Sequence, residues 1–167
     1  MNIAIVGATG NVGRKTLEVL EKKELEIDNL YLVASSRSAG IKIKFRGKEY
    51  EVEELDSFDF SKAKIIFFAA GGKISEKFAE KASKNSLVID NSSFFRMDPD
   101  VPLIVPQVNS EDLDSIKKNI VANPNCSTAQ LVIALKPLHD LFVIKRVVVS
   151  TYQSVSGGGK APMDELI

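Results

Sequence analysis

Short runs of apolar residues recur along the chain, and a polar or glycine-rich segment follows each of them. These runs occupy residues 3–6, 30–34, 65–70 and 87–89, and their continuity predicts parallel strands that are covered on both faces. Between the runs, apolar residues recur at helical spacing over residues 12–20 and 74–82. Strands that alternate with helices predict the α/β class, a doubly wound parallel sheet of the Rossmann type.

Other patterns extend this picture along the chain. Residues 41–45 and 50–52 lie on either side of Arg46-Gly47-Lys48, which predicts a small hairpin. A short apolar run at residues 120–122 leads into a helical pattern that begins near Cys126. Residues 142–152 carry the strongest strand signal in the chain, and a polar loop and the start of a further helix follow them.

Composition and charge narrow the class of protein. The chain has 167 residues, of which 44% are hydrophobic and 26% charged, with a formal net charge of zero. This balance gives no electrostatic reason to expect nucleic acid or an anionic membrane surface as a partner. The first residues lack a basic leader, and their apolar run is too short for a signal or membrane segment. We therefore expect a soluble, cytoplasmic protein, and the single cysteine excludes an intramolecular disulfide.

A glycine-rich turn follows the first predicted strand. It has the spacing G-x-x-G-x-x-G and comprises Gly7, Thr9, Gly10, Asn11, Val12 and Gly13 together with Ala8. Glycines let the backbone approach a pyrophosphate, which then lies on the N-terminus of the next helix. The strand–turn–helix order favours dinucleotide binding, and an ordinary tight turn is the alternative.

The residues after the second predicted strand indicate which dinucleotide binds. They are Ser35, Ser36, Arg37 and Ser38, with no carboxylate to hold a ribose 2′-hydroxyl. Hydroxyls and a guanidinium suit the 2′-phosphate of NADP, so we expect NADP as the coenzyme. A solvated polar turn is the other interpretation. In a parallel sheet the loops beginning at Gly7, Ser35, Gly71 and Asn91 should meet at one edge.

The motif with the most chemical content is Asn123-Pro124-Asn125-Cys126-Ser127-Thr128. Pro124 restrains the turn and Asn125 is a good cap, which predicts Cys126 in the first turn of a helix. Unpaired N–H groups and the positive end of the helix dipole favour a thiolate there, the nucleophilic form of cysteine. A buried structural thiol remains the alternative from these residues alone.

These motifs together resemble the aspartate-β-semialdehyde dehydrogenase family. The similar segments are residues 7–13, 35–38, 69–72, 90–93, 123–128 and 151–157. The resemblance covers all 167 residues, roughly the first half of such an enzyme. N-acetyl-γ-glutamyl-phosphate reductase is a less similar alternative, and a non-catalytic nucleotide-binding module is another. A short-chain-type reductase would need a Tyr-x-x-x-Lys pair, which none of the three tyrosines provides.

The resemblance implies NADP-dependent reductive dephosphorylation of L-4-aspartyl phosphate to L-aspartate 4-semialdehyde, a step towards lysine (through diaminopimelate), threonine and methionine. It makes Cys126 the nucleophile that forms a thioester, and Gln153 a residue that orients the substrate. It assigns phosphate binding to Arg96 and substrate contacts to Asn91, Ser93 and Asn125. The remaining coenzyme-binding residues that it implies, besides residues 7–13 and 35–38, are Ala70, Gly71, Ser92 and Gly157. It implies no metal.

The resemblance also predicts how the chain is divided and what it lacks. We expect an NADP-binding domain over residues 1–125 and the nucleophile helix with the start of a catalytic domain over residues 126–167. The family's acid/base histidine and substrate arginine lie in the C-terminal half, and His139 does not match that motif. The chain should therefore bind NADP weakly and turn over little or nothing. Intact members of the family are dimers, and an unpaired strand over residues 142–152 should invite pairing.

Overall fold

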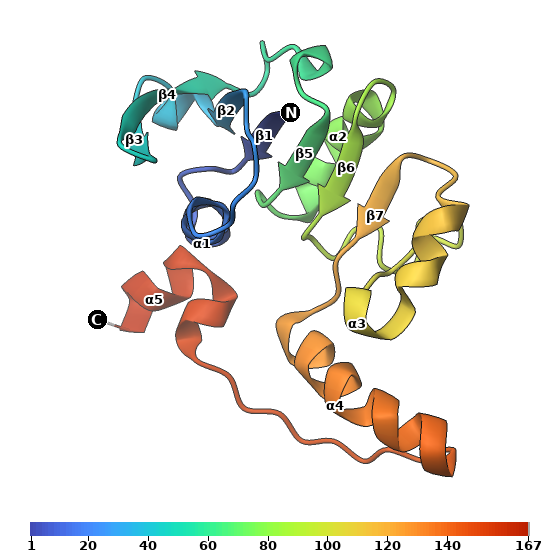
Figure 1. The fold of residues 1–167 in the computed structure, drawn as a ribbon. Coiled ribbons are helices and arrows are strands. Elements are labelled where there is room, and N and C mark those ends of the chain that lie inside the picture. The colour runs from blue at the N-terminus through green and yellow to red at the C-terminus, as the bar shows by residue number, and fades with distance from the viewer. Residues whose placement is uncertain (167) are drawn as a thin grey trace.

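The computed structural model describes residues 1–166, and a single mixed sheet organises most of them (Figure 1). The strands are β1 (Asn2–Val6), β2 (Asn29–Ala34), β3 (Lys42–Phe45), β4 (Lys48–Glu54), β5 (Ile65–Phe68), β6 (Leu87–Asp90) and β7 (Ile120–Ala122). Their order across the sheet is β3-β4-β2-β1-β5-β6-β7. Only the β3–β4 pair is antiparallel among these strands, so the predicted parallel sheet and the predicted hairpin are both confirmed.

Helices cover both faces of the sheet, which makes it doubly wound. The helices are α1 (Asn11–Glu21), α2 (Gly72–Ser83), α3 (Pro106–Asn109), α4 (Cys126–Phe142) and α5 (Lys160–Leu166), with short 3₁₀ turns η1 (Ser36–Ser38), η2 (Phe60–Lys62), η3 (Ser110–Ser115) and η4 (Val155–Gly158). Leu17 and Leu20 of α1 pack on one face, with Ile3 and Ile5. Phe78, Ala79 and Ala82 of α2 pack on the other. None of the helices in the described residues is long and apolar enough to cross a membrane.

The central strands alternate their side chains between these two cores. Ile66 and Phe68 of β5 are fully buried in the core beneath α2, whereas Phe67 packs against the core beneath α1. A run without polar residues is required because each face of such a strand meets a helix or another apolar layer. The buried apolar runs thus explain why β1 and β5 lie at the centre of the sheet.

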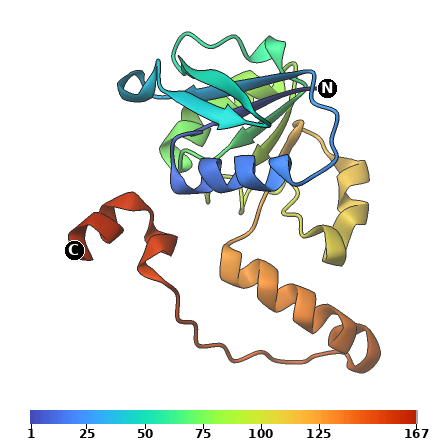
Figure 2. The same cartoon turned by 60° about the vertical axis from the view of Figure 1, so that its left-hand side comes forward.

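The predicted strand over residues 142–152 is wrong. Phe142 ends α4, and residues 143–154 have no helix, strand or turn. In Figures 1 and 2 this segment runs as an extended connection between α4 and α5, away from the sheet. Its side chains are open to solvent, with Val148 84% and Tyr152 98% exposed. A strand needs a neighbour to receive its hydrogen bonds, and within residues 1–166 nothing pairs with this segment.

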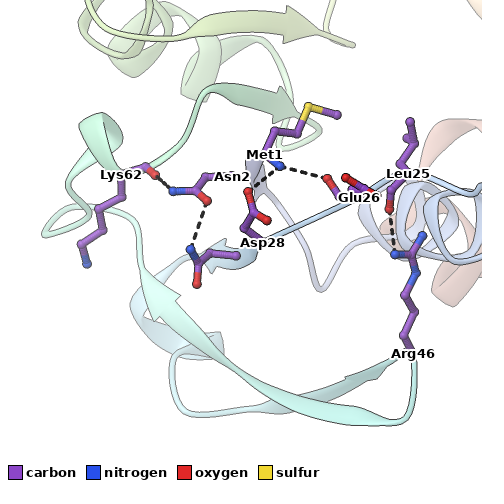
Figure 3. A network of polar contacts seen from close by, with 8 residues as sticks. Met1, Asn2, Leu25, Glu26, Asp28, Arg46 and Lys62 are labelled. Atoms are coloured by element: carbon purple, nitrogen blue, oxygen red, sulfur yellow. Dashed lines mark hydrogen bonds and ion pairs between the residues drawn. The ribbon is translucent and has the colours of Figure 1, made fainter.

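Polar contacts connect the hairpin and Met1 to the segment that follows α1, and Figure 3 shows those of Arg46 with Leu25 and of Met1 with Glu26 and Asp28. Arg46 lies in the β3–β4 turn, and its guanidinium donates hydrogen bonds to the carbonyl oxygens of Leu20, Lys23 and Leu25. Its backbone N–H donates to the Glu21 carboxylate at 2.7 Å. The ammonium group of Met1 pairs nearby with the Asp28 carboxylate at 2.7 Å. The guanidinium therefore connects the hairpin turn to the Leu20 carbonyl in the last turn of α1 and to the segment that follows this helix.

Candidate functional site

The carboxyl ends of β1, β2, β5, β6 and β7 lie along the same edge of the sheet, because these strands are parallel. The loops that begin at Gly7, Ser35, Ala69, Asn91 and Asn123 therefore meet at this edge (Figure 1). The predicted gathering of loops is confirmed. Open α/β sheets bind ligands in this position.

The glycine-rich turn is folded tightly between β1 and α1. Gly7 has a φ of +86°, and its N–H donates to the Val33 carbonyl at 2.8 Å. Gly10 caps α1, and its N–H donates to the Gly7 carbonyl at 3.0 Å. A Cβ atom at Gly13 would lie only 2.2 Å from the Gly7 carbonyl oxygen. Gly7 and Gly13 are thus required for this backbone, which leaves the first turn of α1 accessible to a pyrophosphate.

The predicted NADP-selecting residues lie beside the glycine-rich turn. The backbone of residues 35–38 forms η1, in which the Ser38 N–H donates to the Ser35 carbonyl at 2.8 Å. The Thr9 hydroxyl donates to the Ser38 hydroxyl at 3.4 Å, which joins the two loops. Ser35, Ser36 and Arg37 are exposed, so their side chains are available to a ligand.

The loop after β5 lies on the other side of the glycine-rich turn. Gly71 adopts a φ of +89° as the N-cap of α2, and Ala70 and Gly71 are both exposed. A Cβ atom at Gly7 would lie 2.8 Å from the Ala69 carbonyl carbon, which shows how closely the loops after β1 and β5 approach. The predicted coenzyme-binding residues of these two loops are therefore adjacent.

The loop after β6 places Arg96 next to the cysteine motif. Arg96 Nε donates to the Asn123 carbonyl at 2.9 Å, and its Nη2 donates to the Asn91 carbonyl at 3.4 Å. The side-chain amide of Asn123 donates to the Asn91 side-chain oxygen. Ser93 is exposed in the same loop. The predicted substrate-binding residues Asn91, Ser93 and Arg96 thus lie together, beside Asn123.

Cys126 is the first residue of α4, as predicted. The Asn125 side chain caps the helix by accepting a hydrogen bond from the Ser127 N–H at 2.9 Å. The Cys126 thiol is exposed, and its Sγ lies 3.9 Å from Oε1 of Gln153. A Cβ atom at Gly157 would approach the Gln153 side chain to 3.0 Å, which places Gly157 in the same group. Two segments 27 residues apart in sequence therefore converge at the thiol.

A cavity of about 760 Å³ connects the coenzyme-binding loops to this group. Its lining includes Asn11, Val12, Ala69, Asn91, Asn123 and Ser156. The cavity follows α1 from Asn11 to Leu20, passes the ends of β5 and β6, and reaches the motif that carries Cys126. Cys126 itself does not line it, and the cavity reaches the motif at Asn123.

Some residues of the site were not predicted from the sequence, and one predicted residue has an unexpected environment. Asn123 was missed, although it is the first polar residue after a buried strand, and this position is a signal for a sheet-edge site. Ser92 is only 7% exposed, and its hydroxyl donates to Asp90 and accepts from the Phe94 N–H.

His139 lies 13 residues along α4 from Cys126, about 20 Å away at the helical rise of 1.5 Å per residue. It is therefore far from the thiol.

Hydrogen bonds lower the pKa of several carboxyl groups in the chain. On α1, hydrogen bonds from Lys15 and Lys22 lower the pKa of Glu18 to about 2. A hydrogen bond from Lys118 lowers the pKa of Asp98, and the Asp100 backbone N–H adds to this effect. Both carboxylates accept these bonds in their charged form, which is the form that the bonds stabilise. Glu18 lies on α1, whereas Asp98 lies in the loop after β6, two residues beyond Arg96.

Comparisons with known proteins agree with this arrangement. Residues 2–116 match the family model described as semialdehyde dehydrogenase, NAD binding domain, and residues 135–167 match the one described as semialdehyde dehydrogenase, dimerisation domain. An aspartate-semialdehyde dehydrogenase of Shewanella violacea is 51% identical over 167 residues, which are 99% of this chain and 49% of the relative. The chain spans about half the length of the curated relatives it matches.

Solved structures show the same similarity. A crystal structure of aspartate semialdehyde dehydrogenase II from Vibrio cholerae, complexed with ASA, matches 99% of this chain and 50% of its own with a TM-score of 0.96 and 50% identity. Aspartate semialdehyde dehydrogenase from Candida albicans, solved with NADP, matches 86% of this chain and 48% of its own with a TM-score of 0.70 and 31% identity. The fold, the family models and the identities lead to one conclusion: the chain belongs to the semialdehyde dehydrogenase family.

Proposed function

We propose that this chain carries the coenzyme-binding loops and the nucleophile of an NADP-dependent aspartate-semialdehyde dehydrogenase. The reaction is the reductive dephosphorylation of L-4-aspartyl phosphate to L-aspartate 4-semialdehyde, on the route to lysine, threonine and methionine. One observation carries the proposal: an exposed cysteine begins α4, with Gln153 at 3.9 Å, at the sheet edge where the glycine-rich turn and Arg96 also lie.

The residues fit NADP. Gly7 and Gly13 form a turn in which a Cβ atom would meet backbone atoms, and this turn leaves the first N–H groups of α1 for a pyrophosphate. Exposed Ser35, Ser36 and Arg37 lie next to it, and they suit a 2′-phosphate. When bound, NADPH supplies the hydride that reduces an acyl group to an aldehyde.

The chain's own residues account for the remaining chemistry. The Cys126 thiolate attacks the acyl carbon of aspartyl phosphate, so that a C–S bond forms while the bond from that carbon to the phosphate oxygen breaks. Arg96, beside Asn91 and Asn123, holds the leaving phosphate through charge-assisted hydrogen bonds. Gln153, in contact with the thiol, orients the acyl group. The thioester on Cys126 would accept the hydride that the coenzyme supplies, which would release the aldehyde and restore the thiolate.

The division of the chain and its assembly follow from the same proposal. Residues 1–125 form the NADP-binding domain, and residues 126–167 supply the nucleophile helix and begin the catalytic domain, through which the intact enzyme forms a homodimer. The acid/base histidine of the family has no counterpart here. We therefore expect little or no turnover when the 167-residue chain is assayed with the semialdehyde, phosphate and NADP. Sustained turnover at the rate of a full-length family member would contradict this expectation.

Alkylation of Cys126 tests the proposed nucleophile. We expect iodoacetamide to label Cys126 readily, because its thiol is exposed at the start of α4. Inorganic phosphate should slow the labelling, and Cys126→Ser should abolish it, since the chain has one cysteine. Labelling is followed by intact-protein mass spectrometry. A slow thiol that phosphate does not protect would favour a non-catalytic nucleotide-binding module.

The coenzyme preference is tested with Arg37→Ala. We expect this variant to lose about tenfold in NADP affinity, because one charge-assisted hydrogen bond to the 2′-phosphate is worth roughly 1.5–3 kcal/mol when it is partly exposed. Affinity for NAD, which lacks this phosphate, should stay within about twofold and serves as the internal control. Both affinities are measured by calorimetric titration. An equal loss for the two coenzymes would contradict the proposed role of Arg37.

A further inference from the structure

Asp90 is a fully buried carboxyl group that the proposed chemistry does not use. It ends β6 with 0% exposure, directly beneath the loop that carries Arg96. Oδ1 accepts hydrogen bonds from the Ser75 hydroxyl at 2.6 Å and from the Ser92 N–H at 3.1 Å, and Oδ2 accepts from the Ser92 hydroxyl at 2.7 Å. Among the described residues, no lysine or arginine pairs with it. Burial of such a group is unfavourable unless hydrogen bonds compensate for the lost water.

The hydrogen bonds between Ser92 and Asp90 hold the start of the loop after β6. Ser92 donates to Asp90 through both its backbone N–H and its hydroxyl. The same hydroxyl accepts from the Phe94 N–H at 3.1 Å, so the side chains of Asp90 and Ser92 satisfy two backbone donors of the loop, those of Ser92 and Phe94. The hydroxyl of Ser92 is therefore engaged inside the loop. Ser75 anchors the other side of Asp90 to α2.

Asp90 also connects this loop to the cysteine motif. Its backbone carbonyl accepts a hydrogen bond from the Asn123 N–H at 2.8 Å. Asn123 in turn accepts from Arg96 through its carbonyl and donates to Asn91 through its side chain. The two loops that flank the proposed phosphate site are thus held on either side of one buried residue, and Cys126 follows three positions after Asn123.

We propose that Asp90 is a positioning residue for the phosphate subsite: it acts through Ser92 to fix the loop over residues 91–96, and so holds Arg96 and Asn91 beside the Cys126 motif. This inference rests on the proposed function, in which Arg96 binds the leaving phosphate. It assigns the Ser92 hydroxyl to the loop, whereas the sequence resemblance assigned it to the coenzyme.

Two serine-to-alanine variants separate positioning from general stability. Ser92→Ala removes the hydroxyl that donates to Asp90 and accepts from the Phe94 N–H, and it leaves the Ser92 N–H in place. Ser86→Ala is the matched control, because Ser86 is equally buried (5% exposed) and its hydroxyl donates to the carbonyls of Phe60 and Ala63, away from the site. We expect both to lower the melting temperature. Only Ser92→Ala should raise the phosphate concentration that half-protects Cys126 from iodoacetamide, by about tenfold, as expected for a displaced charged ligand group.

A measurement without phosphate keeps the result independent of the proposed function. In the unsubstituted chain, we expect the hydrogens of the Phe94 amide and of the Arg96 Nε–H group to exchange slowly with solvent, and NMR measures this exchange. Ser92→Ala and Asp90→Asn should accelerate both, while the Asn91 amide, which donates to the Phe68 carbonyl at 2.9 Å, stays protected. Asp90→Asn keeps the shape of the side chain but replaces one acceptor oxygen with a donor.

The outcomes distinguish the two hypotheses. If phosphate does not protect Cys126 in the unmodified chain, the proposed function fails, and the exchange of Phe94 and Arg96 still decides the role of Asp90. If Ser92→Ala and Ser86→Ala have the same effect on exchange at Phe94 and Arg96, Asp90 contributes only to stability and the inference is overturned. If Asp90→Asn does not fold, Ser92→Ala still gives the answer, since it leaves the carboxyl group with two donors.

Discussion

Replacing Gly13 with alanine should abolish NADP binding and lower the free energy of unfolding by roughly 3 kcal/mol or more. The new Cβ atom would lie 2.2 Å from the Gly7 carbonyl oxygen and 2.8 Å from the Ala8 Cα atom. Both neighbours are backbone atoms of the glycine-rich turn, so no side chain can move aside to relieve the contact. The turn and the first residues of α1 must separate, and the N–H groups proposed to hold the pyrophosphate lose their arrangement.

Gly10→Ala is the matched control for this prediction. Gly10 has a φ of −76°, and a Cβ atom there would meet the Gly7 carbonyl oxygen at 3.4 Å, an ordinary contact. This variant should keep its stability within about 1 kcal/mol, because an alanine in place of a glycine N-cap has only a modest effect on a helix. Urea unfolding and NADP titration measure both variants. Equal behaviour of Gly10→Ala and Gly13→Ala would show that the close approach between α1 and the turn is unimportant.

Replacing Phe68 with alanine should lower the free energy of unfolding by about 3–5 kcal/mol, the range for a deleted phenylalanine in a packed core. Phe68 is fully buried at the end of β5, and its ring stacks on Phe60 with the centroids 6.3 Å apart. Its backbone carbonyl also accepts from the Asn91 N–H at 2.9 Å. Because domains of this size are stable by roughly 5–15 kcal/mol, the loss is a large fraction of the total.

Phe142→Ala makes the same chemical change on the surface. Phe142 ends α4 and its side chain is mostly exposed, so we expect a change within about 0.5 kcal/mol. Urea unfolding monitored by far-UV circular dichroism compares the two variants. If Phe142→Ala were as destabilising as Phe68→Ala, the apolar segment after α4 would have to be packed in solution.

The parts of the fold that the sequence predicted are those that depend on short-range signals. The strands β1, β2, β5 and β6 read as unbroken apolar runs because both of their faces meet apolar groups. The glycine spacing predicted the turn before α1, since only a residue without a Cβ fits at Gly13. The start of α4 at Cys126 followed from Asn125, whose side chain makes the capping hydrogen bond.

The rest depends on contacts between distant segments. Residues 142–152 have the composition of a strand, but a strand also needs a neighbouring strand with which to form hydrogen bonds. Among the described residues this segment has none, and most of its side chains are exposed. Asn123 meets Arg96 and Asn91 only because β6 and β7 are neighbours in the sheet. The partners of Asp90, one of them on α2, were hidden for the same reason. The family resemblance placed Gln153 and Cys126 in one site, where they are in contact. Their separation in sequence alone does not predict this contact.

The guanidinium of Arg46 has a mechanical consequence for α1. Arg46 in the hairpin turn holds the C-terminal end of this helix through the Leu20 carbonyl and the Glu21 carboxylate, and the N-terminal end follows a turn in which Gly13 packs closely against Gly7. A helix that is held at both ends has little freedom to move as a rigid body. We therefore expect any conformational change on ligand binding at this edge of the sheet to occur in the loops after β6 and β7. We expect α1 to keep its position.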